Sequence, residues 1–135
     1  MMKANTGAMM VLGLGTDLIE IARVQASMDK FGRRFLERVF TPGEIAYCLR
    51  KKRNAAESFA ARFAAKEAGA KALGTGISQG VSWREIEVVR VLGERPELAF
   101  HGRAKEQART MGVERISLSV THSRDVAMAV VVLEG

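Results

Sequence analysis

Residues 59–73 read FAARFAAKEAGAKAL and are followed at once by Gly74-Thr75-Gly76. The stretch is rich in alanine, lacks proline and β-branched residues, and is followed by a glycine where a left-handed cap is favoured, so it predicts a helix of several turns. At about 100° per residue, four alanines share one side of this helix: Ala61, Ala65, Ala68 and Ala72. Because no long side chain interrupts them, this side can lie very close to another backbone.

The remaining arc of the helix mixes charged and aromatic side chains: Arg62, Lys66, Glu67 and Lys71, with Phe59 and Phe63 among them. An ordinary surface helix separates its large apolar residues from its charges. One interpretation is therefore a helix that packs against a sheet and lines a cleft. The other is an i,i+4 pair between Glu67 and Lys71, with Arg62 and Lys66 solvated beside it. Considered alone, the helix favours the second interpretation.

The length of 135 residues predicts a single domain spanning 1–135. No apolar run is long enough to span a bilayer, and the N-terminus carries too little hydrophobic core for a signal peptide, so we expect a cytoplasmic protein. The single cysteine, Cys48, cannot form an internal disulfide, and no Cys/His cluster has zinc-ligand spacing. We therefore expect Cys48 to be a small packed residue.

The net charge of +6 favours phosphorylated or acidic partners. Nucleic acid is one candidate, but the basic residues are scattered apart from residues 50–53, and that cluster has no interleaved aromatic residues to stack on bases. We interpret residues 50–53 as a solvated helix end. Phosphate-bearing small molecules and acidic proteins fit the charge equally well, so a small basic nucleic-acid-binding protein is kept as the alternative function.

The N-terminal part predicts a strand followed by a helix. Residues 9–14 are apolar and predict a buried strand that ends near Gly15, with glycines that allow close approach to its backbone. From residue 16 to residue 24 the apolar spacing becomes helical, so Asp17 is expected at a strand-to-helix junction. Asp17 and Glu20 have the spacing of a capping box, which the local sequence favours. The alternative is a carboxylate at a strand end, offered to a cation in a cleft.

Later segments carry clear local signals for helices and hairpins. Thr41, Pro42 and Glu44 predict a capped helix start, and residues 103–111 predict a polar helix capped by Gly112. Alternating apolar residues predict two hairpins, whose strands are residues 84–89 with 97–100 and residues 116–120 with 126–133.

Two further features leave alternatives open. The glycines of Gly74-Thr75-Gly76 either only end the helix or leave backbone N–H groups free to meet a phosphate. His122 falls in the turn of the second hairpin, where a histidine is more often a surface residue than a catalyst.

Three separated segments together resemble a known enzyme family. They are GLGTDLIEIARV at residues 13–24, RFAAKEAGAKALGTG at residues 62–76 and LSVTHS at residues 118–123. In sequence, order and separation they are similar to the holo-[acyl-carrier-protein] synthases of the 4′-phosphopantetheinyl transferase superfamily. The resemblance extends from about residue 10 to the C-terminus.

This resemblance implies a Mg²⁺-dependent enzyme that moves 4′-phosphopantetheine from coenzyme A to a serine of apo acyl carrier protein, supports fatty acid biosynthesis and releases adenosine 3′,5′-bisphosphate. It implies an α+β fold in which a curved antiparallel sheet packs on the long central helix. It also implies a homotrimer whose active sites lie between subunits, with neither membrane nor nucleic acid as a partner.

The resemblance also assigns roles to individual residues. Asp17 and Glu67 match the metal ligands, and Arg23 matches a residue that docks the acidic carrier protein. The residues matching those near coenzyme A are Arg62, Lys66, Lys71, Gly74, Thr75, Gly76, Thr121 and His122. The implied catalytic set is Asp17, Glu67, Lys71 and His122. The serine proton could go to His122 or to a metal-bound water near Glu67, and the sequence does not choose between them.

The chemistry of these residue types agrees with the implied reaction. Mg²⁺ is a hard cation that favours one or two carboxylates together with phosphate oxygens and waters. Transfer from a pyrophosphate needs negative charge to be neutralised, which a metal and nearby lysines supply.

Overall fold

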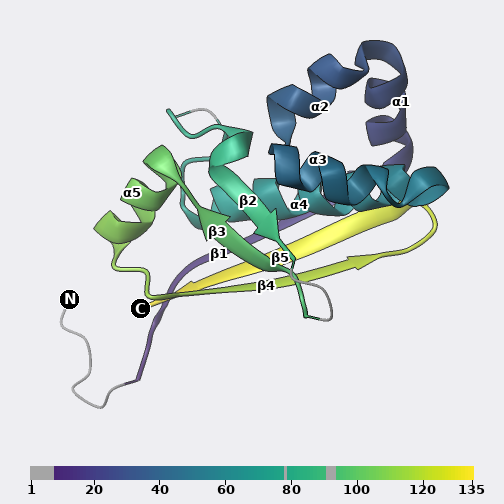
Figure 1. Cartoon of the computed structure of the whole chain (residues 1–135). Coiled ribbons are helices and arrows are strands. Elements are labelled where there is room, and N and C mark those ends of the chain that lie inside the picture. Colours follow the sequence, from purple (N-terminus) through teal and green to yellow (C-terminus); the bar gives the residue numbers. More distant parts are fainter. Residues whose placement is uncertain (1–7, 78, 91–93) are drawn as a thin grey trace.

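The computed structural model describes residues 8–77, 79–90 and 94–135 (Figure 1). Its elements in chain order are β1 (Val11–Glu20), α1 (Ile21–Phe31), α2 (Arg33–Val39), α3 (Pro42–Leu49), the 3₁₀ turn η1 (Lys52–Asn54), α4 (Ala55–Ala72), the 3₁₀ turn η2 (Trp83–Glu85), β2 (Ile86–Val89), β3 (Glu97–Phe100), α5 (Gly102–Met111), β4 (Arg115–His122) and β5 (Val126–Glu134).

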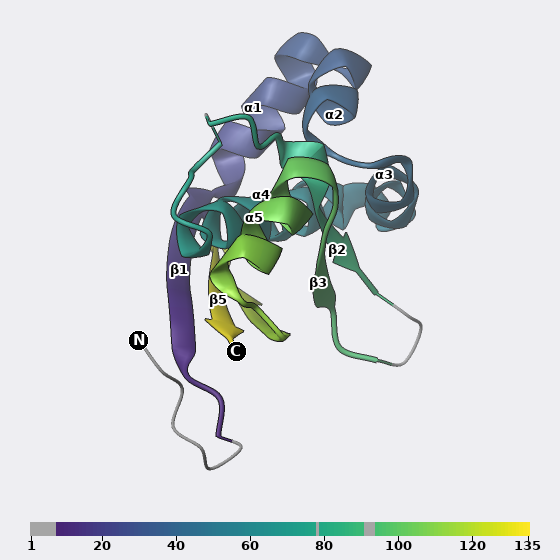
Figure 2. The ribbon, with the colours of Figure 1, turned by 90° about the vertical axis from the view of Figure 1, so that its left-hand side faces the viewer.

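The strands form an antiparallel sheet and a separate hairpin. The sheet has the order β1-β5-β4, and β2 pairs with β3 alone. Figure 1 shows the helices gathered on one face of the sheet, with α4 lying along it. After a quarter turn, Figure 2 shows β1 on one side of α4 and the β2–β3 hairpin with α3 on the other. The predicted α+β class, the antiparallel sheet and the long central helix are confirmed.

The first strand is longer than the sequence predicts. β1 continues to Glu20 because its backbone pairs with β5 along this whole stretch, with Asp17 opposite Ala129 and Glu20 opposite Val126. The helix α1 begins only at Ile21, and Glu20, its N-cap residue, makes no side-chain cap bond. The predicted capping box of Asp17 and Glu20 is therefore wrong. Pairing with a distant strand has overridden a local helical spacing, and Asp17 lies within a strand.

The alanine face of α4 packs on β1 as predicted. A methyl group added to Gly13 or Gly15 would overlap the carbonyl oxygen of Ala72 or Ala68, respectively, so the strand and helix backbones lie in direct contact there. α4 begins at Ala55, earlier than the predicted Phe59, and Gly74 follows it in the left-handed conformation at φ 80°. The glycines of β1 thus set the distance between the sheet and the helix.

We expect the Gly15→Ala variant to lose about 3 kcal/mol or more of the free energy of unfolding, because the added methyl group must push two backbones apart. Gly43→Ala is the matched control, since a methyl group there meets its nearest atoms at 3.8 Å and 4.0 Å. The control should be neutral or slightly stabilising in urea denaturation. Equal stability of Gly15→Ala and wild type would contradict the close packing of β1 on α4.

Other local predictions are confirmed. Thr41 and Glu44 form a complete capping box at the start of α3. Both hairpins pair as predicted, and Gly112 caps α5 in the left-handed conformation. Cys48 is fully buried. Between the strands of the first hairpin, the sequence also predicts a turn at residues 93–96, and its first residue, Gly93, lies outside the described residues. Within the part of the chain that the structure describes, no helix is long and apolar enough to cross a membrane.

The two faces of the sheet differ in character. Ala127, Ala129, Val131 and Leu133 of β5 are fully buried under α4. The opposite face carries exposed apolar side chains, including Leu14 and Leu18, which are 65% and 62% exposed, and Met128. No helix covers this outer face of the sheet in Figure 1.

Candidate active site

The geometry of α4 separates its polar side chains into two flanks. With the alanine face on the sheet, Arg62 and Lys71 are nine positions apart in the sequence, which corresponds to about half a turn around a helix. Lys71 faces β1, where it pairs with Asp17, whereas Arg62 lines a pocket with Tyr47 of α3 and Val88 of β2. Figure 2 shows β1 on one side of α4 and α3 with the β2–β3 hairpin on the other. Glu67 lies one turn before Lys71 on the helix. We call Asp17, Glu67 and Lys71 the carboxylate flank.

Asp17 and Lys71 meet in the carboxylate flank. Lys71 Nζ lies 3.0 Å from Asp17 Oδ1 and donates a second hydrogen bond of 3.0 Å to the carbonyl oxygen of Thr16. The Asp17 side chain is only 15% exposed, and its other oxygen, Oδ2, is buried without a hydrogen-bond partner among the described residues. A carboxylate oxygen in this state is costly unless a cation or another donor reaches it.

The register of β1 on α4 relates Asp17 to one turn of the helix. The β-carbon positions of Gly13 and Gly15 meet Ala72 and Ala68, respectively, so two residues along the strand correspond to four along the helix. Asp17 therefore falls beside the turn that precedes Ala68, and Glu67 belongs to that turn. One oxygen of Glu67, Oε1, accepts a hydrogen bond of 3.1 Å from the indole nitrogen of Trp83. The i,i+4 interpretation is wrong for Lys71, whose carboxylate partner is Asp17.

The carboxylate flank fits a small hard cation. Asp17 offers a buried oxygen with no partner in the described structure, and Glu67 has a second oxygen beyond the one held by Trp83. The residues that the structure describes contain no group of three His, Cys, Asp or Glu side chains that could hold a metal ion. A pair of carboxylates suits Mg²⁺, which takes its remaining ligands from water and phosphate, and does not suit the closed sites of structural zinc.

The other flank of α4 opens into a cavity of about 350 Å³ that is rich in cations. Its polar lining also includes Asn54, Glu57 and Ser58, and we call the other five polar residues the cation flank: Arg62, Tyr47, Lys51, Arg90 and His122. Val120 and His122 both reach it because alternate residues of a strand share one face. Thr121 lies between them and belongs to the other face, so the structure does not bring Thr121 into this cavity.

Tyr47 is surrounded by positive charge in the cation flank. The Arg62 guanidinium lies 4.1 Å from the centre of its ring, and Lys51 and Arg50 lie 5.0 Å and 5.6 Å from it. Burial alone would raise the pKa of Tyr47, but the charges of Arg90, Lys51 and Arg62 outweigh it and leave the pKa below its usual value. Such a field favours anions.

The Arg62 guanidinium uses some, but not all, of its N–H groups in hydrogen bonds with described residues. It is buried, and its Nη1 donates to the hydroxyl of Ser58 at 3.1 Å and to the Ser58 carbonyl oxygen at 3.4 Å. Its Nε is buried and unpaired within the described residues. The interpretation of Arg62 as a solvated side chain is therefore wrong.

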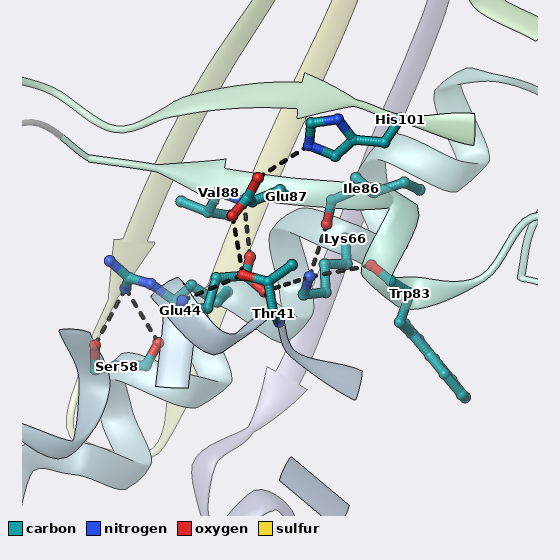
Figure 3. Close-up of polar contacts among 10 residues, drawn as sticks. Thr41, Glu44, Ser58, Lys66, Trp83, Ile86, Glu87, Val88 and His101 are labelled. Atoms are coloured by element: carbon teal, nitrogen blue, oxygen red, sulfur yellow. Dashed lines mark hydrogen bonds and ion pairs between the residues drawn. The ribbon is translucent and has the colours of Figure 1, made fainter. Parts of the chain in front are cut away.

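The environment of Lys66 differs from the predicted one, because its side chain is buried in an ion pair with Glu44. Its side chain is fully buried, and Nζ lies 2.6 Å from Glu44 Oε1, 2.7 Å from the carbonyl oxygen of Ile86 and 3.0 Å from that of Trp83 (Figure 3). Burial lowers the pKa of Lys66, and Glu44 opposes that change. All three ammonium protons have acceptors, so the predicted contact with a coenzyme A phosphate is contradicted, as is the predicted solvation.

The Gly74-Thr75-Gly76 loop ends the helix. The N–H of Gly74 donates to the Lys71 carbonyl oxygen, and those of Thr75 and Gly76 donate to the Ala70 carbonyl oxygen at 3.3 Å and 3.2 Å. These bonds complete the C-terminus of α4, which decides between the two interpretations of the loop. A nucleotide contact of this loop would have to use the Thr75 side chain or a carbonyl oxygen rather than these N–H groups.

Arg23 lies beside an apolar groove. It is exposed on α1 and lines a groove of about 460 Å³ together with Leu18, Val24, Phe35 and Phe63. Leu18 follows Asp17 directly in β1, so the groove adjoins the carboxylate flank.

The two flanks lie at opposite edges of the sheet. Asp17 belongs to the edge strand β1 and His122 to the edge strand β4, with β5 between them. The structure therefore brings Asp17, Lys71 and Glu67 to one side of α4, and Arg62 and His122 to the other.

Sequence reasoning missed several residues of this region. Trp83, Tyr47 and Arg90 carried no motif, and Glu44 was noticed only as part of a capping box. The available signals were the single tryptophan and the single tyrosine of the chain. A buried tryptophan N–H or tyrosine O–H usually forms a hydrogen bond, so a polar partner could have been expected for each of these residues.

Comparison with known proteins identifies the family. A sequence model of the 4′-phosphopantetheinyl transferase superfamily matches residues 13–131. The chain therefore belongs to this superfamily, and the enzyme class expected from the three motifs is confirmed.

Individual relatives agree with this assignment. The chain is 51% identical over 125 residues to a holo-[acyl-carrier-protein] synthase of Koribacter versatilis, covering 93% of this chain and 99% of the relative. Among solved structures, that of the holo-[acyl-carrier-protein] synthase from Neisseria meningitidis matches with a TM-score of 0.84 and 36% identity, over 93% of this chain and all of that one. The Helicobacter pylori enzyme in complex with coenzyme A matches with a TM-score of 0.77 and 33% identity, over 89% and 98%.

Proposed function

We propose that this chain transfers 4′-phosphopantetheine from coenzyme A to a serine of apo acyl carrier protein and releases adenosine 3′,5′-bisphosphate, with Mg²⁺ as the cofactor. The observation that carries the proposal is Asp17 Oδ2, which is buried beside Lys71 and has no hydrogen-bond partner among the described residues, in a chain whose relatives are named holo-[acyl-carrier-protein] synthases. The carrier that serves fatty acid biosynthesis and a cytoplasmic location are parts of the same proposal.

Asp17 and Glu67 would hold the metal through Asp17 Oδ2 and one oxygen of Glu67. When bound, Mg²⁺ supplies positive charge to the phosphates of coenzyme A as bonds to phosphorus form and break. Lys71 is 53% exposed and lies beside Asp17, so its ammonium can approach the same phosphates from the solvent side. Its hydrogen bond to the Thr16 carbonyl oxygen fixes its direction.

The attacking serine hydroxyl must lose a proton. His122 is exposed and makes a contact of 3.4 Å between Nδ1 and the Ser123 carbonyl oxygen, which leaves Nε2 able to accept a proton. A water held near Glu67 is the other candidate, and the rate of a His122→Gln variant at saturating Mg²⁺ distinguishes the two bases. If His122 is the base, that rate falls by about 10²–10⁴-fold.

We propose that a complete site needs a second copy of the chain. The carboxylate flank and the cation flank lie at opposite edges of one sheet, so the carboxylate flank of one copy can meet the cation flank of the next. A head-to-tail contact closes into a ring when the rotation between neighbouring copies divides a full turn evenly, and we propose a trimer, as the family resemblance implies. The exposed apolar outer face of the sheet, with Leu14, Leu18 and Met128, supplies surface for such a contact.

The carrier protein would dock beside Arg23. The apolar groove next to Arg23 adjoins the carboxylate flank, so a partner held there can present a serine to the metal site. The net charge of +6 suits both an acidic carrier and a cofactor with three phosphates.

The tyrosine of the cation flank gives a prediction about phosphate binding. Tyr47 is the only tyrosine, so the absorbance of its phenolate reports one site. Since nearby cations favour the phenolate, its pKa in the folded protein should lie below that in the unfolded protein. Adenosine 3′,5′-bisphosphate should raise the pKa, because its phosphates neutralise those cations. A pKa that does not respond to saturating ligand would place the phosphates elsewhere.

The experiment for the whole proposal is incubation with coenzyme A, Mg²⁺ and apo acyl carrier protein, followed by mass spectrometry of the carrier. We expect the carrier to gain one phosphopantetheine group on a serine. Binding of coenzyme A without that gain would instead indicate a phosphate-binding protein without turnover. Tight oligonucleotide binding that weakens steeply with salt, again without the mass gain, would favour the nucleic-acid alternative.

A further inference from the structure

A buried ion pair lies beside the proposed active site without facing it. Glu44 Oε1 accepts from Lys66 Nζ at 2.6 Å and from the Thr41 N–H at 2.8 Å, and Oε2 accepts from the Val88 N–H at 2.7 Å. Both side chains are fully buried. Figure 3 shows these bonds joining α3, α4 and β2 at one point. The pair therefore fixes three elements against one another.

Trp83 connects this pair to the carboxylate flank. Its carbonyl oxygen accepts from Lys66 Nζ at 3.0 Å, and its indole points away from the pair in Figure 3. The indole nitrogen donates to Glu67 Oε1 at 3.1 Å. Lys66 and Glu67 are consecutive in α4, so Trp83 bridges two neighbouring side chains that leave the helix in different directions.

The ring of Trp83 is itself held in place. Phe63 lies 6.1 Å from it, measured between ring centres, and the Arg38 guanidinium lies 6.0 Å from the ring centre. With its carbonyl oxygen fixed by Lys66 and its ring fixed by these neighbours, the indole N–H has little freedom to turn. It can impose an orientation on Glu67.

Without that donor, Glu67 has a competing partner. Lys71 lies one turn further along α4, at the spacing of an i,i+4 pair. A free Glu67 carboxylate could turn toward the Lys71 ammonium and leave the carboxylate flank unable to bind a cation. The indole N–H holds Glu67 Oε1 and so restricts the turning of the carboxylate, whose second oxygen is the one proposed for the metal.

We propose that Trp83 is a positioning residue: its indole N–H orients Glu67 for the metal, and the buried Glu44–Lys66 pair anchors Trp83. This inference rests on the proposed metal role of Glu67. In this proposal Lys66 anchors Trp83 and does not bind phosphate. Substitution of a residue that hydrogen-bonds to a metal ligand typically weakens metal binding by about 10–100-fold.

The test is the Trp83→Phe variant, which removes the N–H donor and keeps an aromatic ring beside Phe63. Mn²⁺ is the probe, and the electron paramagnetic resonance signal of free Mn²⁺ measures its binding without turnover. We expect binding to weaken about 10–100-fold and the Mg²⁺ concentration for half-maximal transfer to rise by the same factor. The rate at saturating Mg²⁺ should change much less. Arg84→Ala, the matched control, changes an exposed side chain next to Trp83 in the same 3₁₀ turn and should leave Mn²⁺ binding unchanged.

Two outcomes overturn the inference in distinguishable ways. If Glu67→Gln binds Mn²⁺ as wild type does, the metal role of Glu67 fails and the inference fails with it. If Glu67→Gln loses binding while folded Trp83→Phe keeps it, the metal role stands and the positioning role alone is wrong.

A measurement on the unaltered protein covers the case in which Trp83→Phe does not fold. Trp83 is the only tryptophan, so its indole N–H gives one ¹H–¹⁵N signal. We expect Mg²⁺ to shift this signal to saturation in wild type and to have no such effect in Glu67→Gln. An indole signal that ignores Mg²⁺ in wild type would overturn the inference.

Discussion

The Asp17→Asn variant is expected to lose transfer activity by at least about 10³-fold, since a metal stabilises transition-state charge by several kcal/mol and each tenfold corresponds to about 1.4 kcal/mol. The substitution keeps the shape of the side chain and removes its charge. Its stability should match or exceed that of wild type, because Oδ2 of Asp17 has no partner among the described residues and is costly to bury. The loss of activity should therefore not come from a loss of stability.

The measurement is the initial rate of carrier modification at limiting and at saturating Mg²⁺, together with urea denaturation. Asp29→Asn is the matched control, because Asp29 is exposed on α1 and accepts a hydrogen bond from Gln25, which an asparagine can also accept. Its rate should equal that of wild type. A near-normal rate of Asp17→Asn at limiting Mg²⁺ would show that Asp17 does not bind the metal.

The Lys66→Met variant should lose about 3–5 kcal/mol of the free energy of unfolding, the usual result of removing one partner from a buried ion pair. Glu44 would stay buried without its cationic partner, and among the described residues the N–H groups of Thr41 and Val88 are its remaining donors. The carbonyl oxygens of Ile86 and Trp83 would lose their shared donor as well. A loss of this size is a large share of the stability of a small domain.

Urea denaturation of four proteins tests this prediction: wild type, Lys66→Met, Glu44→Gln with Lys66→Met, and Lys105→Met. The double variant should recover part of the loss, because glutamine keeps an acceptor oxygen and carries no charge. Lys105 is exposed on α5, so its substitution should change the free energy by less than about 0.5 kcal/mol. Similar stability of Lys66→Met and Lys105→Met would mean that Lys66 is solvated after all.

The fold was predictable where neighbouring residues decide it. The alanine face of α4 and the glycines of β1 are visible in the sequence, and together they predict the close contact that Gly15 and Ala68 make. The capping box of Thr41 and Glu44 and the cap of Gly112 involve residues only a few positions apart, so local rules sufficed. The extent of β1 was not predictable in this way, because its last residues are strand only through pairing with β5.

The site was predictable in its residue types and only partly in its contacts. The motifs pointed to Asp17 and Lys71, which do meet, although they are separated by 54 positions. The burial of Lys66 depends on Glu44 and on two carbonyl oxygens far along the chain, so neither spacing nor charge could indicate it. Similarly, the donor to Glu67 comes from a tryptophan in a short 3₁₀ turn with no motif of its own. Helix periodicity gives the direction of a side chain but not its partner.

The most direct test of the central claim, that the carboxylate flank of one copy works with the cation flank of another, is complementation between two inactive proteins. One carries Asp17→Asn, and the other carries Lys51→Ala with His122→Ala, two exposed positions of the cation flank. In a randomly mixed ring, about one site in four receives both unaltered flanks. We predict that the mixture modifies apo acyl carrier protein at about a quarter of the wild-type rate. A mixture no more active than the average of its two components would contradict a site shared between copies.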